Sequence, residues 1–392
     1  MQRSRFGVPR SVRGSKLEGD RSCRRRGRQS EEHGMKAVRF EQYGDVDELK
    51  VEQIAKPEAG PGQVVVAVKA AGLNPGEAAI RAGLLHDVFP AAFPSGQGTD
   101  FAGIVDEVGA GVDEWSAGDE VVGWATRSSH AEFVVVPRDQ LVAKPENVVW
   151  EVAGSISVTG PTAYAALRAV QATEGDTIVV SAAAGGVGVM ASQLAILGGL
   201  TVIGTASERN HDFLRSLGVI PVEYGEGVVD RIREAAPQGV DAYIDCYGHG
   251  NVEYALELGV APQRIDTIID FAAVERHGVK GEGSAQATTP AVLAELLGLI
   301  AEAKIVVPID GVFPSTASRT PTATSRTGTP AASTCWAWTS SSTRANARAT
   351  APAATSGPTR RPERSRRPAP PAGSDPREPR RRGSRHGVGA RT

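Results

Sequence analysis

The residues best placed for chemistry form a glycine-rich turn between two apolar runs. Thr177-Ile-Val-Val-Ser181 has the composition of a buried strand, and Ala182-Ala-Ala-Gly185-Gly186-Val-Gly188 leads from it into an apolar helix predicted over 189–197. Glycines permit a sharp turn and a close approach to a pyrophosphate, and the helix N-terminus offers free N–H groups and a positive dipole end. A second strand predicted over 201–205 completes the context of a dinucleotide site. The expected backbone contacts are Ala184, Gly185, Gly186, Val187 and Gly188.

The end of that second strand bears on which dinucleotide binds. In NAD-binding versions, an Asp or Glu about 20 residues along accepts a hydrogen bond from the ribose 2′-hydroxyl. Here Thr205 occupies that place, and Ser207 and Arg209 follow. Loss of the carboxylate removes repulsion of a 2′-phosphate, which hydroxyls and a guanidinium can bind. NADP(H) is therefore favoured, although Glu208 weakens the case and Arg209 has the alternative role of a solvated residue.

Charge divides the chain into an acidic middle and two basic ends. Residues 1–34 carry ten Lys and Arg against four acidic residues, and residues 315–392 carry fifteen Arg against three. Residues 35–314 hold 18 basic and 38 acidic residues, which disfavours nucleic acid and anionic membranes as partners. Both ends are poor in apolar residues, so we predict disordered N- and C-terminal segments.

The ends have alternative interpretations. Residues 1–34 are either an upstream extension before a functional start at Met35 or a flexible arm. Residues 315–392 are dominated by Ser, Thr, Ala, Arg, Pro and Gly, as expected when GC-rich DNA is read out of frame. The competing interpretation is a genuine basic tail that binds nucleic acid.

Within 35–314 the pattern changes once, near residue 160. Before it, short β-rich runs punctuated by Gly, Pro and Asp predict a small β-barrel. These runs cover 63–69, 103–109, 119–124 and 131–137. After it, strand and helix patterns alternate as in a parallel α/β sheet, followed by a helix around 292–300 and an apolar strand over 304–308.

Cysteines and targeting signals indicate a reducing compartment. Cys23, Cys246 and Cys335 lie too far apart to suggest a disulfide framework or a Cys-rich zinc site, and the N-terminus has no apolar signal segment. We therefore expect a cytoplasmic protein. The uncharged stretch 177–207 is long enough to span a bilayer, but its glycines and its Ser and Thr clusters fit a strand, turn, helix and strand better.

Five motifs, taken in order, extend this interpretation over residues 35–314. They are Ala70-Ala-Gly-Leu-Asn74-Pro75, Gly98-Thr-Asp-Phe-Ala-Gly103, Val108-Gly-Ala-Gly-Val112, Gly160-Pro-Thr-Ala-Tyr164 and Ala183–Gly188. With them the chain resembles the zinc-independent quinone oxidoreductase (ζ-crystallin-like) branch of the medium-chain dehydrogenase/reductase superfamily.

The resemblance implies an α/β protein with two domains and the cofactor between them. A GroES-like β-barrel catalytic domain is expected over 35–159 and a Rossmann-type doubly wound parallel sheet over 160–284, with a return segment over 285–314. A homodimer is a family-level expectation.

The sequence departs from the family pattern in places. Ala182 stands where a glycine is expected, and His130 where an aromatic residue often precedes Ala-Glu. The tyrosines that line the quinone cleft of some relatives have no match around Leu84–Leu85. The family's chain also ends with a helix and strand that residues 315–392 cannot supply by composition.

The metal-ligand positions of zinc-dependent relatives are filled by other residue types. They align with Asn74, Thr99 and the neighbourhood of Val158, none of which is a competent zinc ligand, and the histidines show no ligand spacing. We therefore predict no metal. Conjugated acceptors spread the charge of an incoming hydride over several atoms, so hydrogen-bond donors suffice without a Lewis acid.

The resemblance also suggests individual site residues. Asn74 is the candidate amide donor at the nicotinamide, or else a turn residue before Pro75. Thr162 hydrogen-bonds the nicotinamide side or caps its helix. Tyr224 stacks on the adenine or is a core residue. Cys246 and Phe271 follow later strands, where open α/β sheets bind ligands, and Cys246 is interpreted as a small packed residue rather than a nucleophile.

The leading hypothesis is an NADPH-dependent reductase of quinones, enones or other conjugated acceptors. A non-catalytic NADPH-binding or sensor protein, a zinc-free alcohol or aldehyde reductase, and a damaged gene product without function are the alternatives.

Overall fold

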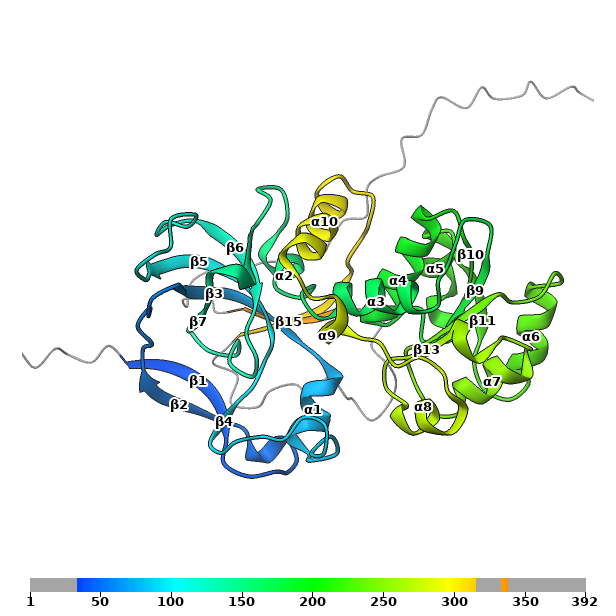
Figure 1. Ribbon diagram of the computed structural model, residues 1–392, viewed down its shortest axis with the longest axis horizontal. Coiled ribbons are helices and arrows are strands. Elements are labelled where there is room, and N and C mark those ends of the chain that lie inside the picture. The colour runs from blue at the N-terminus through cyan, green and yellow to red at the C-terminus, as the bar shows by residue number, and fades with distance from the viewer. Residues whose placement is uncertain (1–33, 315–332, 338–392) are drawn as a thin grey trace, which may run out of the picture. The chain divides into compact units, whose positions relative to one another are not determined.

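The computed structural model describes residues 34–314 and the backbone of residues 333–337 (Figure 1). Within this part, strands form three sheets, ordered β2-β1-β4, β14-β15-β3-β5-β6-β8 with β7 also paired to β3, and β11-β10-β9-β12-β13. The strands are β1 (Gly34–Phe40), β2 (Lys50–Ala55), β3 (Gln63–Leu73), β4 (Ser95–Gly96), β5 (Asp100–Val108), β6 (Glu120–Trp124), β7 (Phe133–Pro137), β8 (Leu141–Ala143), β9 (Thr177–Val180), β10 (Thr201–Ala206), β11 (Ile220–Glu223), β12 (Ala242–Asp245), β13 (Ile265–Thr267), β14 (Ile309–Pro314) and β15 (Ser333–Ala337).

The helices concentrate in the second half of the described chain. They are α1 (Pro75–Arg81), α2 (Trp150–Ala153), α3 (Thr159–Ala169), α4 (Gly186–Leu197), α5 (His211–Ser216), α6 (Val228–Ala235), α7 (Asn251–Glu257), α8 (Phe271–His277), α9 (Ser284–Ala287) and α10 (Pro290–Ala301).

The long strand β3 organises the antiparallel part of the fold. Its run of β-branched valines favours an extended chain, and Val64, Val65 and Val66 are fully buried. One edge of β3 pairs with β5, while the other is shared by β7 at residues 63–67 and by β15 at residues 70–73. This sheet, together with the β2-β1-β4 sheet, is the predicted GroES-like unit.

The second half contains the predicted parallel sheet with helices on both faces (Figure 1). Every pairing between β9, β10, β11, β12 and β13 is parallel. Successive side chains of a strand point to opposite faces, so Ile178 and Val180 join the core with α3 and α4, while Val179 joins the core with α6 and α7. The doubly wound architecture is therefore confirmed.

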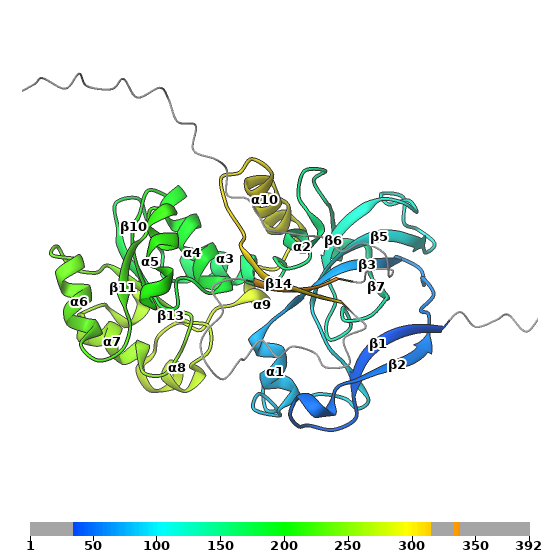
Figure 2. The same ribbon diagram turned by 180° about the vertical axis from the view of Figure 1, so that it is seen from behind.

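The prediction of a strand over 304–308 is wrong. Ile305 and Val307 are buried as the apolar pattern required, but the backbone pairs with a side chain instead of a strand. Val306 N donates to Gln193 Oε1 at 2.8 Å, and Gln193 Nε2 donates to the Val306 carbonyl at 2.8 Å. The strand begins later, as β14, which joins the sheet that contains β3 (Figure 2).

The prediction that residues 315–392 add no ordered element is corrected at residues 333–337. β15 lies between β14 and β3, parallel to the former and antiparallel to the latter. Backbone pairing needs no large apolar content, and Thr334 and Trp336 are residue types that favour strands. The rest of 315–392 and residues 1–33 of the predicted extension 1–34 lie outside the described residues, and Gly34 begins β1.

Candidate active site

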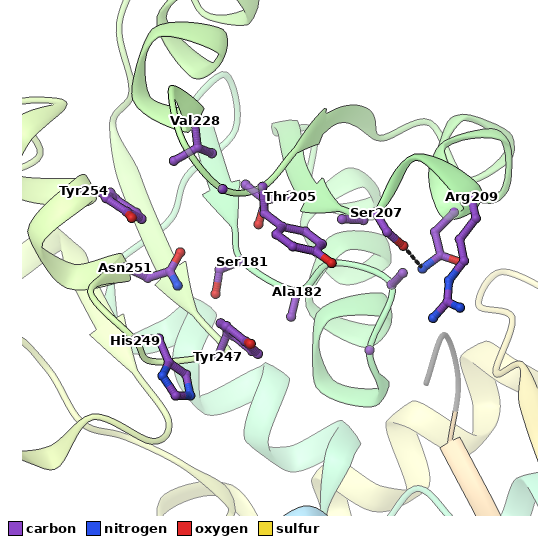
Figure 3. A pocket seen from close by; sticks show the side chains of 16 residues that line it. Ser181, Ala182, Thr205, Ser207, Arg209, Val228, Tyr247, His249, Asn251 and Tyr254 are labelled. Atoms are coloured by element: carbon purple, nitrogen blue, oxygen red, sulfur yellow. Dashed lines mark hydrogen bonds between the residues drawn. The ribbon is translucent and has the colours of Figure 1, made fainter. Parts of the chain in front are cut away.

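A cavity of about 460 Å³ opens at the carboxyl ends of the parallel strands. Residues that end or follow β9, β10, β11 and β12 contribute to its lining, which is where open α/β sheets bind ligands. Figure 3 shows Thr205, Ser207 and Arg209 on one side of it and Tyr247 and His249 on the other. The full lining consists of Ser181, Ala182, Ala184, Gly185, Thr205, Ala206, Ser207, Arg209, Asn210, Tyr224, Gly225, Val228, Tyr247, His249, Asn251 and Tyr254.

The glycine-rich turn forms one wall of this cavity. α4 begins at Gly186, three residues before the predicted start, so Gly186, Val187 and Gly188 form its first turn. The first N–H groups of a helix have no partner within the helix and can bind a phosphate. A Cβ on Gly188 would lie 2.3 Å from the Ala182 carbonyl oxygen, so only a glycine fits there.

Ala182 explains how the turn works without its expected glycine. Its φ is 47°, in the left-handed region that glycine adopts freely and alanine adopts at a cost of about 1 kcal/mol. The turn therefore keeps at Ala182 the left-handed backbone conformation that a glycine would adopt there. Ala182 also lines the cavity beside Gly185, whose N–H donates to the Ala182 carbonyl at 2.8 Å.

The residues proposed for phosphate recognition lie together at the end of β10. Thr205 is buried at 3% exposure, and Ser207 accepts a hydrogen bond from Asn210 Nδ2 at 3.3 Å. Arg209 lies in the short 3-10 helix Glu208–Asn210 and lines the cavity. Tyr224 also lines it and is 60% exposed, so the alternative of a core tyrosine is wrong.

The opposite wall follows β12, a strand end where the sequence predicted ligand binding, although Tyr247 and His249 were not among the predicted site residues. Tyr247 and His249 follow β12, with ring centroids 4.9 Å apart, and both line the cavity. Asp245, at the end of β12, accepts hydrogen bonds from the N–H groups of Tyr247 and Gly248, both at 2.9 Å, and so holds this turn. The one signal in the sequence was the position of Tyr247 and His249 just after a predicted strand of the parallel sheet.

Seven predicted site residues are not among those that line the cavity: Asn74, Thr162, Gly186, Val187, Gly188, Cys246 and Phe271. Cys246 lies next to the wall, and its N–H donates to Ser181 Oγ at 2.8 Å. Burial raises the pKa of the Cys246 thiol well above its ordinary value, and Asp245 and Asp266 add to the effect, which agrees with a packed residue rather than a nucleophile. Phe271 opens α8, and buried Thr162 donates from Oγ1 to the Val158 carbonyl at 2.6 Å. Their roles toward a cofactor stay predictions.

Asn74 lies elsewhere, at the N-terminus of α1. Its amide nitrogen donates to Glu77 Oε1 at 3.2 Å and to Asp100 Oδ2 at 2.5 Å. An amide nitrogen carries two hydrogens, so these two bonds use both. The carbonyl oxygen of the amide is an acceptor, and the role of Asn74 toward the nicotinamide stays a prediction.

Two family models match the two halves of this architecture. The alcohol dehydrogenase GroES-like domain matches residues 60–146, and the zinc-binding dehydrogenase domain matches residues 186–259. The quinone oxidoreductase of Rattus norvegicus is 32% identical over 231 residues, covering 57% of this chain and 70% of that protein. The solved quinone oxidoreductase of Coxiella burnetii is 30% identical, with a TM-score of 0.68 over 78% of this chain and 99% of that one.

The chain belongs to the quinone oxidoreductase family of the medium-chain dehydrogenase/reductase superfamily.

Other relatives are covered over a smaller share of their own length. The synaptic vesicle membrane protein VAT-1 homolog of Rattus norvegicus is 37% identical over 212 residues, or 53% of this chain and 52% of that protein. The chain thus spans about half the length of the VAT-1 relatives it matches. Within the described residues, no helix combines the length and apolarity needed to cross a membrane.

The positions that hold zinc in metal-dependent members of the superfamily differ here. The positions predicted to align with them are Asn74, Thr99 and the neighbourhood of Val158, where the Val158 N–H donates to Asp100 Oδ1 at 2.5 Å. His130 is buried and bonded through Nε2 to the Gly72 carbonyl at 2.8 Å. In residues 34–314, no three His, Cys, Asp or Glu side chains are grouped as metal ligands.

Proposed function

We propose that this chain is an NADPH-dependent oxidoreductase that reduces a quinone, enone or other conjugated acceptor without zinc. The bound nicotinamide supplies the hydride, and the protein supplies binding, orientation and charge stabilisation. The family membership supports a nicotinamide cofactor, and the residue types at Asn74, Thr99 and Val158 support the zinc-free chemistry.

The charge of the cavity wall is the observation that favours NADPH over NADH. None of the 16 lining residues, all within the described chain, is Asp or Glu, and Arg209 is among them. A 2′-phosphate placed near Thr205 and Ser207 would meet hydroxyl groups and a guanidinium rather than a carboxylate. Charge-assisted hydrogen bonds of this kind contribute about 1.5–3 kcal/mol each.

The walls also suit the rest of an adenosine diphosphate group. The N–H groups of the first turn of α4, next to the lining residues Ala184 and Gly185, would receive the pyrophosphate. Tyr224 and Tyr247, both about half exposed on the cavity, offer flat faces on which an adenine can stack. These contacts are common to both dinucleotides, so they contribute affinity but not discrimination.

The cofactor prediction is tested by comparing Arg209→Ala with the unaltered chain. Loss of one charge-assisted contact should weaken NADPH binding about 10- to 100-fold and NADH binding about twofold at most. Titration calorimetry with each dinucleotide measures both constants. Arg215→Ala is the control, since that side chain is exposed on α5 and pairs with Asp212. Tighter binding of NADH than of NADPH by the unaltered chain would refute the phosphate argument.

The reaction is tested by following NADPH oxidation with a panel of quinones, enones and simple aldehydes, and NADP⁺ reduction with alcohols. Turnover restricted to conjugated acceptors supports the proposal. Turnover of simple aldehydes would instead favour the alcohol or aldehyde reductase alternative. Tight NADPH binding with no turnover on any acceptor would favour a binding or sensor protein.

A further inference from the structure

Two buried carboxyl groups converge on the Asn74 amide from different elements. Glu77 lies one turn along α1, and its Oε1 accepts from Asn74 Nδ2 while its Oε2 accepts from the Asn74 N–H at 3.3 Å. Asp100 opens β5 and is fully buried. Its Oδ2 accepts from Asn74 Nδ2, and its Oδ1 accepts from Val158 N just before α3. The amide is thus held from two sides.

Glycine makes room for this arrangement. A Cβ on Gly72 would lie 2.8 Å from Asp100 Oδ2, so a larger residue would push that carboxyl off the amide. The Gly72 carbonyl in turn accepts from His130 Nε2. The cluster is therefore a close-packed unit and not a chance contact of mobile side chains.

We propose that Glu77 and Asp100 are positioning residues that hold the Asn74 amide in one orientation, so that its carbonyl oxygen is the atom presented to an N–H or O–H group of the bound cofactor or acceptor. This inference rests on the proposed function, in which Asn74 lies at the nicotinamide. It replaces the donor role suggested by the sequence with an acceptor role.

The charges around the pair make the orientation sensitive to pH. Burial raises the pKa of Glu77 and of Asp100 to about 7 each, and the charge of Glu77 raises that of Asp100 further. The charge of Arg81 on α1 lowers the pKa of Glu77 and so partly opposes the effect of burial. Asp45 in turn raises the pKa of Arg81. His130 lies 3.8 Å from Glu77 but adds no charge, because burial lowers its pKa to about 4.

The sign of the effect follows from donors and acceptors. With at least one carboxylate ionised, both acceptors face the amide nitrogen and hold it. When both carboxyls are protonated, each carries an O–H that bonds best to the amide oxygen, which turns the amide around. Turnover should therefore fall as the pH drops below about 7.

Two isosteric variants separate this role from simple packing. Asp100→Asn offers one acceptor and one donor where Asp100 offers two acceptors, so it should reverse the Asn74 amide. We expect kcat to fall about tenfold with KM for NADPH changed less than about twofold. Glu77→Gln keeps its acceptor on Asn74 Nδ2 by giving up only the 3.3 Å bond from the Asn74 N–H, whereas Asp100→Asn would have to give up the 2.5 Å bond from Val158 N. Glu77→Gln also removes the like charge, so it should retain more activity and move the acidic limb of the kcat profile to lower pH. Asp47→Asn, an exposed carboxylate, is the matched control.

Infrared difference spectroscopy tests the pair without any turnover. The unaltered chain should show carboxyl protonation near pH 7, and the signal should shrink in each of the two variants but not in Asp47→Asn. An unmoved pH profile in Glu77→Gln, an unchanged kcat in Asp100→Asn, or an unchanged infrared signal in both would overturn the inference. An inactive chain with the expected infrared signal would sink the proposed function alone and leave the titrating pair standing.

Discussion

At the scale of single residues, Asp245 holds the cavity wall that follows β12. It is fully buried at the end of β12, and it accepts hydrogen bonds from two hydroxyls besides the N–H groups of its own turn. Ser181 Oγ donates to Oδ1 and Thr267 Oγ1 donates to Oδ2, each at 2.8 Å. One carboxylate therefore joins β9, β12 and β13 and fixes the turn that carries Tyr247.

Asp245→Ala would leave four donors without their acceptor, three of them buried. We expect the free energy of unfolding to fall by about 3 kcal/mol or more, because each unsatisfied donor bears its full desolvation cost. NADPH affinity should fall with it, since the turn is released. Urea denaturation and dinucleotide titration measure the two effects. Asp212→Ala, with a side chain 99% exposed, should change stability by less than about 0.5 kcal/mol, and an equal effect of both variants would contradict this role.

At the scale of elements, the junction between β9 and α4 depends on two glycines whose neighbours lie too close to admit a side chain. Gly188 packs against the backbone at Ala182, and Gly204 on β10 packs against the side chain of Ala183. The strand-turn-helix unit is therefore close-packed against the next strand. Ala182 adopts a left-handed backbone conformation, so the same turn also tolerates a local backbone strain.

Gly188→Ala should destabilise the fold by about 2 kcal/mol and weaken dinucleotide binding, because the backbone at Ala182 cannot move aside cheaply. Gly298→Ala is a matched control. It lies in α10, which like α4 has 12 residues, and an added Cβ there meets nothing within 4 Å. That control should stabilise the chain by about 0.5–1 kcal/mol. Thermal unfolding of both variants checks the contrast, and a neutral Gly188→Ala would refute the close packing at the turn.

At the scale of the whole molecule, the β3 sheet depends on a strand from far along the chain. β15 pairs with residues 70–73 of β3, directly before Asn74, and with β14 on its other side. Without β15, β14 loses its link to β3 and the last residues of β3 lose their main-chain partners on one edge.

Ending the chain after Pro314 should therefore lower the thermal midpoint relative to the full chain, while ending it after Ala345 should leave the midpoint nearly unchanged. The two truncations differ by the segment that contains β15. Calorimetry on the three chains measures the difference. Equal midpoints for both truncations would show that β15 adds nothing to the stability of the sheet.

Features continuous in the chain were predictable from the sequence. The strand, turn and helix over 177–197 follow from local apolar patterns and glycine spacing, and so does the alternation of strands and helices after residue 160. Thr205, Ser207, Arg209 and Tyr224 could be predicted because they end or follow strands whose carboxyl ends must share one edge of a parallel sheet.

Features that join distant residues were decided by the tertiary structure alone. The pairing of Gln193 with Val306 replaced a predicted strand, and the contact between Glu77, Asn74 and Asp100 joins residues from two separate elements. Hydrogen bonds and burial at these places depend on which elements pack together, and no local pattern records that. The sequence by itself determined the nucleotide-binding unit and the two-part α/β fold; the structure decided the second wall of the cavity, the place of β15 and the carboxyl pair, because each depends on contacts between segments far apart in the chain.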